Sequence, residues 1–443
     1  YEILRCLVGS EMCIRDSNLV RERAARAWER HLSWVPTLYL LRGIPYVAIL
    51  ALVPIVLNRM GTSNAVNLFC CSLALIPFIL RPLLGRFSRQ LTDCHHLILY
   101  AEVLMGLIFL AMGIVLRLKV WLPAFLLLFY AEALAAAFHD VGIGRYFMIC
   151  SERRFYQQVP ATRAAATCAA FALALGIPAM VGGNLEVIHR RIPMAWSTVC
   201  ELLGGFILLL AVYHAVVLVP LGEQLVRKRN DYKTLLLEDL RKLTDRRYFR
   251  FEMLFLLLFL LPEGFFYRVG ILFLVDPGSN GGLSLSPQEL AFTQGTVGAC
   301  GMLLGCLLGG RCIHLHGFRY WLWPMTLAIT LPKVFYVLMA YTLTTSFSLI
   351  TLSVFLEQFG FGFGIMAFVA YLAHLSRGYH PVMFYSYCFA LAAIGITVSG
   401  ALSGILADYL GYRIYFALLM LLSLTSYLAA AFVRTEPIEG LKL

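Results

Sequence analysis

The sequence predicts an all-α protein that crosses a membrane about twelve times, in two bundles of six helices. Hydrophobic residues make up 60% of its 443 residues and charged residues only 14%, whereas about 25% is usual for soluble domains. Apolar runs recur along the chain, and each is long enough for the roughly 20 residues that a spanning helix needs. A basic interval near the middle separates six runs from six more. So much apolar surface cannot form one water-soluble core, so it must face lipid.

The chain divides into six expected units. Residues 1–17 begin without Met and resemble a translated sequencing linker, so they are left out of the fold prediction; the alternative is a genuine short amphipathic segment. Arginines are the commonest charged residues of the segment that follows, 18–33. In order, the units are 1–17, the probable artefact; 18–33, a cytoplasmic N-terminal segment; 34–221, the first six-helix bundle; 222–248, a cytoplasmic basic linker; 249–433, the second bundle; and 434–443, a cytoplasmic tail.

Each apolar run predicts one helix. The runs cover 34–57, 65–84, 97–116, 122–149, 161–188, 194–221, 249–275, 288–312, 320–343, 347–375, 381–407 and 413–433. Lys and Arg of the intervening segments, Arg81 among them, favour one side of the membrane by roughly four to one, which predicts that both termini are cytoplasmic. The net charge of +11 is therefore explained by membrane orientation, and we expect no nucleic-acid partner. The cysteines lie mostly in apolar runs and predict buried, reduced thiols.

The basic interval 222–248 has two interpretations. Leu235, Leu236 and Leu240 share one face of a helix with basic residues around them, which favours an amphipathic helix on the membrane surface. A solvated basic linker fits the same residues. Either form would connect the two bundles.

Two apolar runs carry charges beside helix-breaking residues. In the seventh run Pro262 and Gly264 flank Glu263, and Arg268 follows; in the first run Arg42 precedes a Gly and a Pro. Charges at this depth mark functional sites by default. Broken helices are tolerated only where protein or water satisfies the backbone. Two such segments, one opening each half, favour a transporter built from repeats.

These two segments supply the first candidate site residues. Arg42 and Tyr46 are four residues apart and share a helix face, as do Glu263 and Tyr267. A guanidinium in a cavity suits a carboxylate or phosphate. We therefore expect all four to bind substrate, and Glu263 also to bind a proton. The alternative for Arg42 is structural pairing with one of three intramembrane carboxylates, which are Glu102, Asp140 and Glu263.

Spans 4 and 10 supply further candidates. His139, Asp140 and Arg145 lie in span 4 with Glu132, and Asp140 beside a basic group could carry a proton; the alternative is a packing network that joins Asp140 to Arg163. Glu357 in span 10 is expected to bind substrate and protons. The glycines that follow it would allow close helix approach or gating: Gly360, Gly362 and Gly364. Lys333 in span 9 is expected to pair with Glu357.

Other motifs are weaker. Cys312, His314 and His316 do not have zinc-finger spacing and predict a cytoplasmic turn. His95 and His96 predict an interfacial position. No phosphate-binding loop occurs in a plausible context, so transport driven directly by ATP is not expected. We expect no cofactor and no metal.

Short words in the sequence resemble the AmpG-like branch of the major facilitator superfamily, which includes peptide, acetyl-coenzyme A and drug transporters. In the first half they are 34–39, 43–46, 81–83, His139-Asp140 and Arg163. In the second half they are 262–264, 281–285, 295–298, 323–325 and 357–364. The resemblance implies a twelve-helix fold, solute transport and a cavity lined by the first helix of each half. This chain departs from the family pattern by carrying Arg42, Arg89 and Gly144 where relatives carry acids.

Together these observations predict a secondary active transporter that works by alternating access and is driven by protons. The expected solute is small and, because of Arg42, anionic, such as a muropeptide or peptide fragment. The expected protein is a multi-pass monomer of a bacterial cytoplasmic (inner) membrane, and not an enzyme. Two alternatives stay open: a membrane-embedded transferase that uses His139 and Asp140 as a general base pair, and a degenerate transporter kept as a sensor or scaffold.

Overall fold

The computed structural model of the protein describes residues 20–150, 160–223, 241, 244–245, 248–375 and 381–433, without the side chains of 160–164 and 381–384. The expected artefact at 1–17, the tail 434–443 and almost all of the basic linker lie outside these residues. Within the described part, residues 20–29 form the helix expected near the N-terminus, and no strand occurs.

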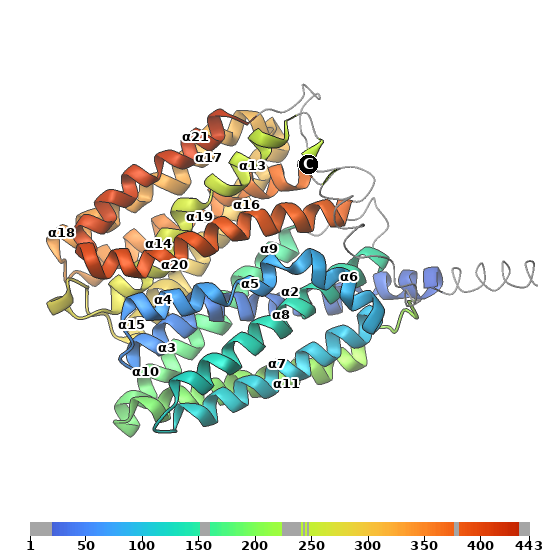
Figure 1. The fold of residues 1–443 in the computed structure, drawn as a ribbon, viewed down its shortest axis with the longest axis horizontal. Helices are drawn as coiled ribbons and strands as arrows, with labels where there is room; N and C mark the ends of the chain where they lie inside the picture. The colour runs from blue at the N-terminus through green and yellow to red at the C-terminus, as the bar shows by residue number, and fades with distance from the viewer. Residues whose placement is uncertain are drawn as a thin grey trace, which may run out of the picture.

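The first half of the chain contains six spans, which occupy the blue to green part of Figure 1. Apolar runs bounded by Ser, Asp, Gly and Pro set their ends. They are span 1, α2 (His31–Val47), η1 (Ala48–Leu52) and α3 (Val53–Arg59); span 2, α4 (Asn64–Leu73), α5 (Ile76–Ile79) and α6 (Arg81–Leu91); span 3, α7 (Cys94–Leu116); span 4, α8 (Leu122–Cys150); span 5, α9 (Pro160–Phe171), η3 (Ala172–Gly176) and α10 (Ile177–His189); and span 6, α11 (Ile192–Val217).

The second half contains the other spans, in yellow to red in Figure 1. They are span 7, α13 (Phe249–Leu258) and α14 (Leu261–Val275); span 8, α15 (Pro287–Leu290), η5 (Ala291–Gly298) and α16 (Ala299–His316); span 9, α17 (Phe318–Thr330), η6 (Leu331–Lys333) and α18 (Val334–Thr342); span 10, α19 (Phe347–Leu375); and spans 11 and 12, α20 (Pro381–Leu422) and α21 (Leu424–Ala431). A short turn, η4 (Gly278–Asn280), follows span 7.

The described helices confirm the predicted number of spans. Ten are long and apolar enough to cross a membrane, and span 2 is an eleventh that bends by 55° between Ile79 and Arg81. The longest of the ten, Tyr385–Ala431, contains two spans, because Gly411 reverses the chain with a φ of +71°. The prediction that Cys312–His316 form a turn was wrong, since these residues complete the last turn of α16.

The irregular segments predicted in spans 1 and 7 are present. Span 7 breaks at Phe259–Leu260, directly before Pro262 occupies the first turn of α14. In span 1, the helix widens into η1 three residues after Pro45, where the Ala48 amide reaches the carbonyls of both Ile44 and Pro45. A proline removes a backbone donor and clashes with the preceding turn, which explains both positions.

Glycines in α19 bring three helices into close contact. A Cβ on Gly362 would lie 2.2 Å from the Met302 carbonyl of α16, and one on Gly360 would lie 2.1 Å from the Ala328 carbonyl of α17. Gly364 also faces α17. The glycines therefore serve close approach on two sides of span 10, as small residues do in membranes. Since α19 is continuous from Phe347 to Leu375, bending at these glycines is not seen, and their role in gating stays a prediction.

The two halves meet along several helices. α4 packs against α20, and the π-helical segments η3 and η5 lie against each other, where a Cβ on Gly295 would lie 2.2 Å from the Cα of Gly176. At the end of span 7, the Asp276 carboxylate accepts hydrogen bonds from Asn58 (2.6 Å) and Asn64 (3.0 Å) of the first half. The Tyr412 hydroxyl donates to the same carboxylate. Polar contacts therefore fasten the halves together at this end.

We expect Gly362→Ala to destabilise the protein by about 1–3 kcal/mol, the usual cost of overpacking, because its methyl group would meet backbone. Thermal unfolding in detergent measures this. Gly205→Ala is the matched control, since nothing lies within 4 Å of a Cβ there and alanine favours a helix. Equal melting temperatures for the two variants would contradict the close contact between α16 and α19.

Candidate functional site

A carboxylate held by two guanidiniums lies inside the first half. Asp140 of α8 forms ion pairs with Arg42 of α2 and with Arg81 of α6, the second at 2.7 Å. Each arginine takes one carboxylate oxygen, and the Asp140 side chain is 1% exposed while that of Arg42 is 19% exposed. The Arg81 guanidinium also lies 5.6 Å from the centre of the Phe389 ring, which belongs to the second half. This cluster therefore joins spans 1, 2 and 4 and touches span 11.

The structure selects among the partners that the sequence left open. Of the three carboxylates considered for Arg42, Asp140 is the one that binds it. Arg81 had been counted among the loop charges that set membrane orientation, and this was wrong, because the residue is 7% exposed and bound to Asp140. Span 2 bends before Arg81 and places it inside the bundle. Arg163 lies in α9, but its side chain is outside the described part of the structure.

A second buried cluster lies in the other half. Lys333 of η6 forms an ion pair with Glu263 of α14 and donates to the Ile329 carbonyl. The prediction that Lys333 pairs with Glu357 was therefore wrong. Glu357 of α19 is 2% exposed and accepts a hydrogen bond from Gln358 at 2.9 Å, and its other oxygen has no hydrogen-bond partner among the described residues. The charges of Glu263 and Lys333 both act on it, so the three groups form one cluster.

Tyrosines flank both clusters. The hydroxyls of Tyr46 and Tyr267 are buried, and neither has a hydrogen-bond partner in the described structure. Tyr46 packs on Phe78, with ring centres 4.5 Å apart, and Tyr267 meets Phe171 of the first half edge to face. Each tyrosine thus offers a hydroxyl without a hydrogen-bond partner among the described residues, one helical turn from a charged side chain of a cluster.

The sequence did not predict a third network, behind the Asp140 cluster. Glu102 of α7 accepts hydrogen bonds from His139 (3.0 Å) and His214 of α11 (2.8 Å). His139 therefore faces spans 3 and 6, whereas its neighbour Asp140 faces spans 1 and 2. The two do not form a general base pair, which removes the basis of the transferase alternative. A lone histidine near the end of span 6 gave no signal of this contact.

The remaining buried charges have structural partners or none. Arg145 binds Glu223 at 2.7 Å and the Thr92 carbonyl at 3.2 Å, so it closes the end of span 4. Glu132 is fully buried, and neither of its oxygens has a hydrogen-bond partner among the described residues. Arg268 is 2% exposed and donates to Ser72 of the first half at 2.5 Å. This contact crosses the interface between the halves.

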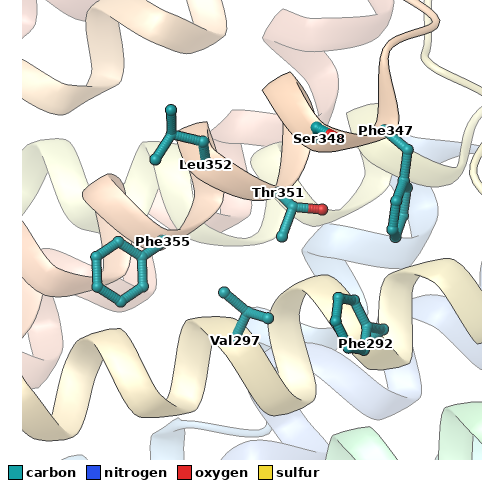
Figure 2. A pocket seen from close by; sticks show the side chains of 7 residues that line it. All are labelled: Phe292, Val297, Phe347, Ser348, Thr351, Leu352 and Phe355. Atoms are coloured by element: carbon teal, nitrogen blue, oxygen red, sulfur yellow. The ribbon is translucent and has the colours of Figure 1, made fainter.

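An apolar groove of about 360 Å³ lies between spans 8 and 10. Phenylalanines from both helices form its walls, and the Thr351 hydroxyl points into it (Figure 2). Its lining residues are Phe292, Val297, Phe347, Ser348, Thr351, Leu352 and Phe355. Phe292 and Leu352 are exposed on the outside of the bundle, so the groove is a lateral, lipid-facing feature. None of the predicted site residues lines it.

One group of side chains in the described structure has the spacing of metal ligands. The ligand atoms of Asp93, His95 and His96 lie within 4.8 Å of one another at the start of α7. His96 already binds Asp93 at 2.5 Å, which accounts for the contact without an ion. His95 is buried at the start of span 3, and its interfacial position stays a prediction.

We expect Lys333→Met to destabilise the protein by about 3–5 kcal/mol, because it leaves the Glu263 carboxylate buried without its cation. Adding Glu263→Gln should restore most of the loss, since both charges are then gone. Thermal unfolding of the single and double variants checks this. Lys333→Met combined with Glu357→Gln is the control, and a larger recovery there than with Glu263→Gln would contradict the observed pairing.

Comparisons with known proteins agree on the fold. No family model matches the chain. A curated protein of Rickettsia bellii named "Putative transporter AmpG 2" is 22% identical over 174 residues, which is 39% of this chain and only 41% of that protein.

Three solved structures cover nearly the whole chain. The nucleoside transporter NupG has a TM-score of 0.64 and 12% identity, and covers 94% of this chain and 100% of its own. A bacterial homolog of the human lysosomal transporter Spinster has a TM-score of 0.63 and 13% identity, and the match covers 93% of this chain and 96% of that one.

The third structure, a D-xylose–proton symporter, has a TM-score of 0.65 and 14% identity, and covers 90% of this chain and 97% of its own. At such identities the likeness concerns the course of the backbone rather than the residues of a site. All three are named as transporters or symporters, and their TM-scores of 0.63 to 0.65 show that they share the fold of this chain. The chain is a multi-pass membrane protein with the major facilitator fold.

Proposed function

We propose that the protein is a secondary transporter that moves a small anionic solute by alternating access and couples this movement to protons. The support is one observation within a major facilitator fold. Each half holds a cluster of charges deep in its helices, around Asp140 in the first half and around Glu263 in the second. Charged side chains in membrane helices are retained where they serve ion or substrate pathways. Each cluster also stands beside an irregular helix, a frequent feature of transporter binding sites.

The charge of the first cluster supports an anionic solute. Two guanidiniums, of Arg42 and Arg81, share the single carboxylate of Asp140, so one positive charge stays uncompensated. Arg42 is the more exposed of the two. Its planar fork suits a carboxylate or phosphate. Tyr46 lies one turn further along α2 and can donate its free hydroxyl to the same group. A muropeptide or another peptide fragment carries such carboxylates.

The second cluster supports coupling to protons. Glu357 has one oxygen without a hydrogen-bond partner in the described structure, so it can take up a proton without breaking an ion pair. Glu263 would release Lys333 when protonated, because their contact depends on both charges. Tyr267 lies on the same face of α14 as Glu263. We assign proton binding to Glu263 and Glu357. Asp140 is a further proton-binding group, whose negative charge holds the two arginines when it is ionised.

The proposed setting is the inner membrane of a bacterium, with both termini in the cytoplasm and the protein acting as a monomer without a nucleic-acid partner. The excess of Lys and Arg on one side of the predicted spans supports this orientation. The central linker, 222–248, would then be a cytoplasmic tether between the halves.

The direct test uses the purified protein in liposomes that enclose a pH-sensitive dye. Cell-wall fragments, small peptides and acyl-coenzyme A are added in turn under an imposed pH gradient. We expect one of these anions to be accumulated and to carry protons with it. If no solute moves under any gradient, transport is refuted and the sensor or scaffold alternative gains support.

We expect Glu263→Gln to abolish uptake driven by a pH gradient but to leave exchange of labelled for unlabelled solute. The reason is that exchange needs binding and alternation, whereas net uptake also needs release of a proton. The control is Glu289→Gln, which alters an exposed carboxylate in the capping box of α15. If uptake driven by the pH gradient survives in Glu263→Gln, Glu263 has no role in proton coupling.

We expect Arg42→Gln to raise the KM for an anionic solute about tenfold or more, as loss of a charge-assisted contact does, with little loss of stability. Asp140 keeps Arg81 as its partner in this variant, so the pair that remains is neutral. Asp140→Asn should instead destabilise the fold, because two buried guanidiniums are left facing each other. Uptake kinetics and thermal unfolding of both variants check this. A larger loss of stability in Arg42→Gln than in Asp140→Asn would contradict the assignment of Asp140 as the shared partner of both arginines.

A further inference from the structure

The network around Glu102 crosses four spans and is buried except at Thr37. Its members are Glu102 on span 3, His139 on span 4, His214 on span 6 and Thr37 on span 1. Glu102 and His214 are 0% exposed and His139 is 1% exposed. The same oxygen of Glu102, Oε1, receives His139 Nε2 at 3.0 Å and His214 Nδ1 at 2.8 Å. With Glu102 ionised, both of these ring nitrogens carry hydrogen and donate to this oxygen.

Charge compensation requires a proton in this network. With both imidazoles neutral, the ionised carboxylate would be a bare negative charge in an apolar interior, which is unfavourable by several kcal/mol. A positive imidazolium next to it removes that charge. His139 and His214 are the groups that contact Glu102 in the described structure. We place the extra proton on one of these two rings rather than on the carboxyl, because the hydrogen bond to an ionised Glu102 is then charge-assisted and stronger.

Other charged and titratable groups on the packed helices are engaged elsewhere or lie at a distance. Three of them form ion pairs: Asp140 with Arg42 and Arg81, Arg145 with Glu223, and Glu201 with Arg117. Tyr213, beside His214, donates to the Ser33 carbonyl. Glu132 precedes His139 by about two helical turns. The network therefore shares no hydrogen bond or ion pair with the Asp140 cluster in the described structure, although His139 and Asp140 are consecutive residues of α8.

The hydroxyl of Thr37 allows His214 to exist in two charge states without movement of heavier atoms. His214 Nε2 lies 3.0 Å from Thr37 Oγ1, which is also 3.2 Å from the Trp34 carbonyl. When His214 is neutral, the hydroxyl donates to Nε2. When His214 is charged, Nε2 donates to the hydroxyl, which turns and donates to the Trp34 carbonyl instead. Thr37 is only partly buried, so protons can reach His214 from its side.

We propose that Glu102, His139 and His214 form a proton-binding site of the transport cycle, with Thr37 as its entry. The site itself stands on these contacts, while its use in transport rests on the proposed function. Thr37 lies on the same helix as Arg42, five residues earlier, and His139 adjoins Asp140. Loss of the proton would loosen spans 1 and 4 from spans 3 and 6, and so move both sides of the Asp140 cluster.

The test of the site uses nitrogen-15 histidine labelling and solid-state NMR of the protein in liposomes at pH 7, with no solute added. We expect one charged imidazole that is lost from the spectrum in His214→Gln or His139→Gln and in Glu102→Gln. Glu201→Gln is the matched control, because this carboxylate also joins α11 to a cation near span 3, at Arg117. Two neutral rings in the wild type, or a charged ring that persists in Glu102→Gln, would overturn the proposal.

A second variant keeps the test valid if Glu102→Gln does not fold. Thr37→Val preserves shape and removes the only proton acceptor of His214 Nε2 that the described structure offers. We expect the charged signal at pH 7 to fall by about half or more, because a buried N–H without an acceptor is penalised. An unchanged signal would contradict the role of Thr37.

Uptake assays separate this proposal from the proposed function. We expect Glu102→Gln to lower pH-driven uptake by about tenfold or more while exchange stays within about twofold of the wild type. If the NMR result holds but the wild type moves no solute, the proposed function fails and the proton site remains. If the wild type transports and Glu102→Gln retains full pH-driven uptake, the site has no part in coupling.

Discussion

The structure depends on ion pairs and charged hydrogen bonds that hold three buried carboxylates in the apolar interior. Asp140 is held by two arginines, Glu263 by Lys333 and Glu102 by two histidines. Each contact joins helices that are distant in the sequence. Apolar side chains cannot supply this specificity, because lipid satisfies them as well as another helix does. The ionic contacts therefore determine which helices are neighbours and at what register, and close packing follows.

Irregular backbone and small residues allow these contacts to form. Pro45 and η1 widen span 1 soon after Arg42, and the break before Pro262 starts a new helix just ahead of Glu263. The bend in span 2 turns Arg81 inward. In the second half, the glycines of α19 bring α16 and α17 into close contact with the helix that carries Glu357. The same features interrupt regular backbone hydrogen bonding at places where the proposed alternating access would require a change of shape.

The fold could be predicted from the sequence, because the length of each apolar run is a direct measure of a span. Partners could be predicted less well. Helical spacing places Glu263 and Tyr267 on one face of span 7, but it does not say which helix lies opposite, so Lys333 was assigned to Glu357 and not to Glu263. Arg81 was read as a loop charge because hydropathy does not register a bend. His214 gave no signal, since a single histidine near a span end is also compatible with an interfacial position.

The two central clusters differ in sign, and this difference offers a mechanism for coupling. Two arginines and one aspartate leave the first cluster with a positive charge, whereas one lysine and two glutamates leave the second with a negative charge. With Glu357 ionised the two clusters together carry no net charge and have no net attraction for an anion. Uptake of one proton by Glu263 or Glu357 would make their summed charge positive, and an anionic group bound at Arg42 would restore neutrality. In the proposed cycle, proton and anion then stabilise each other in the interior, as linkage requires of any coupled pair of ligands.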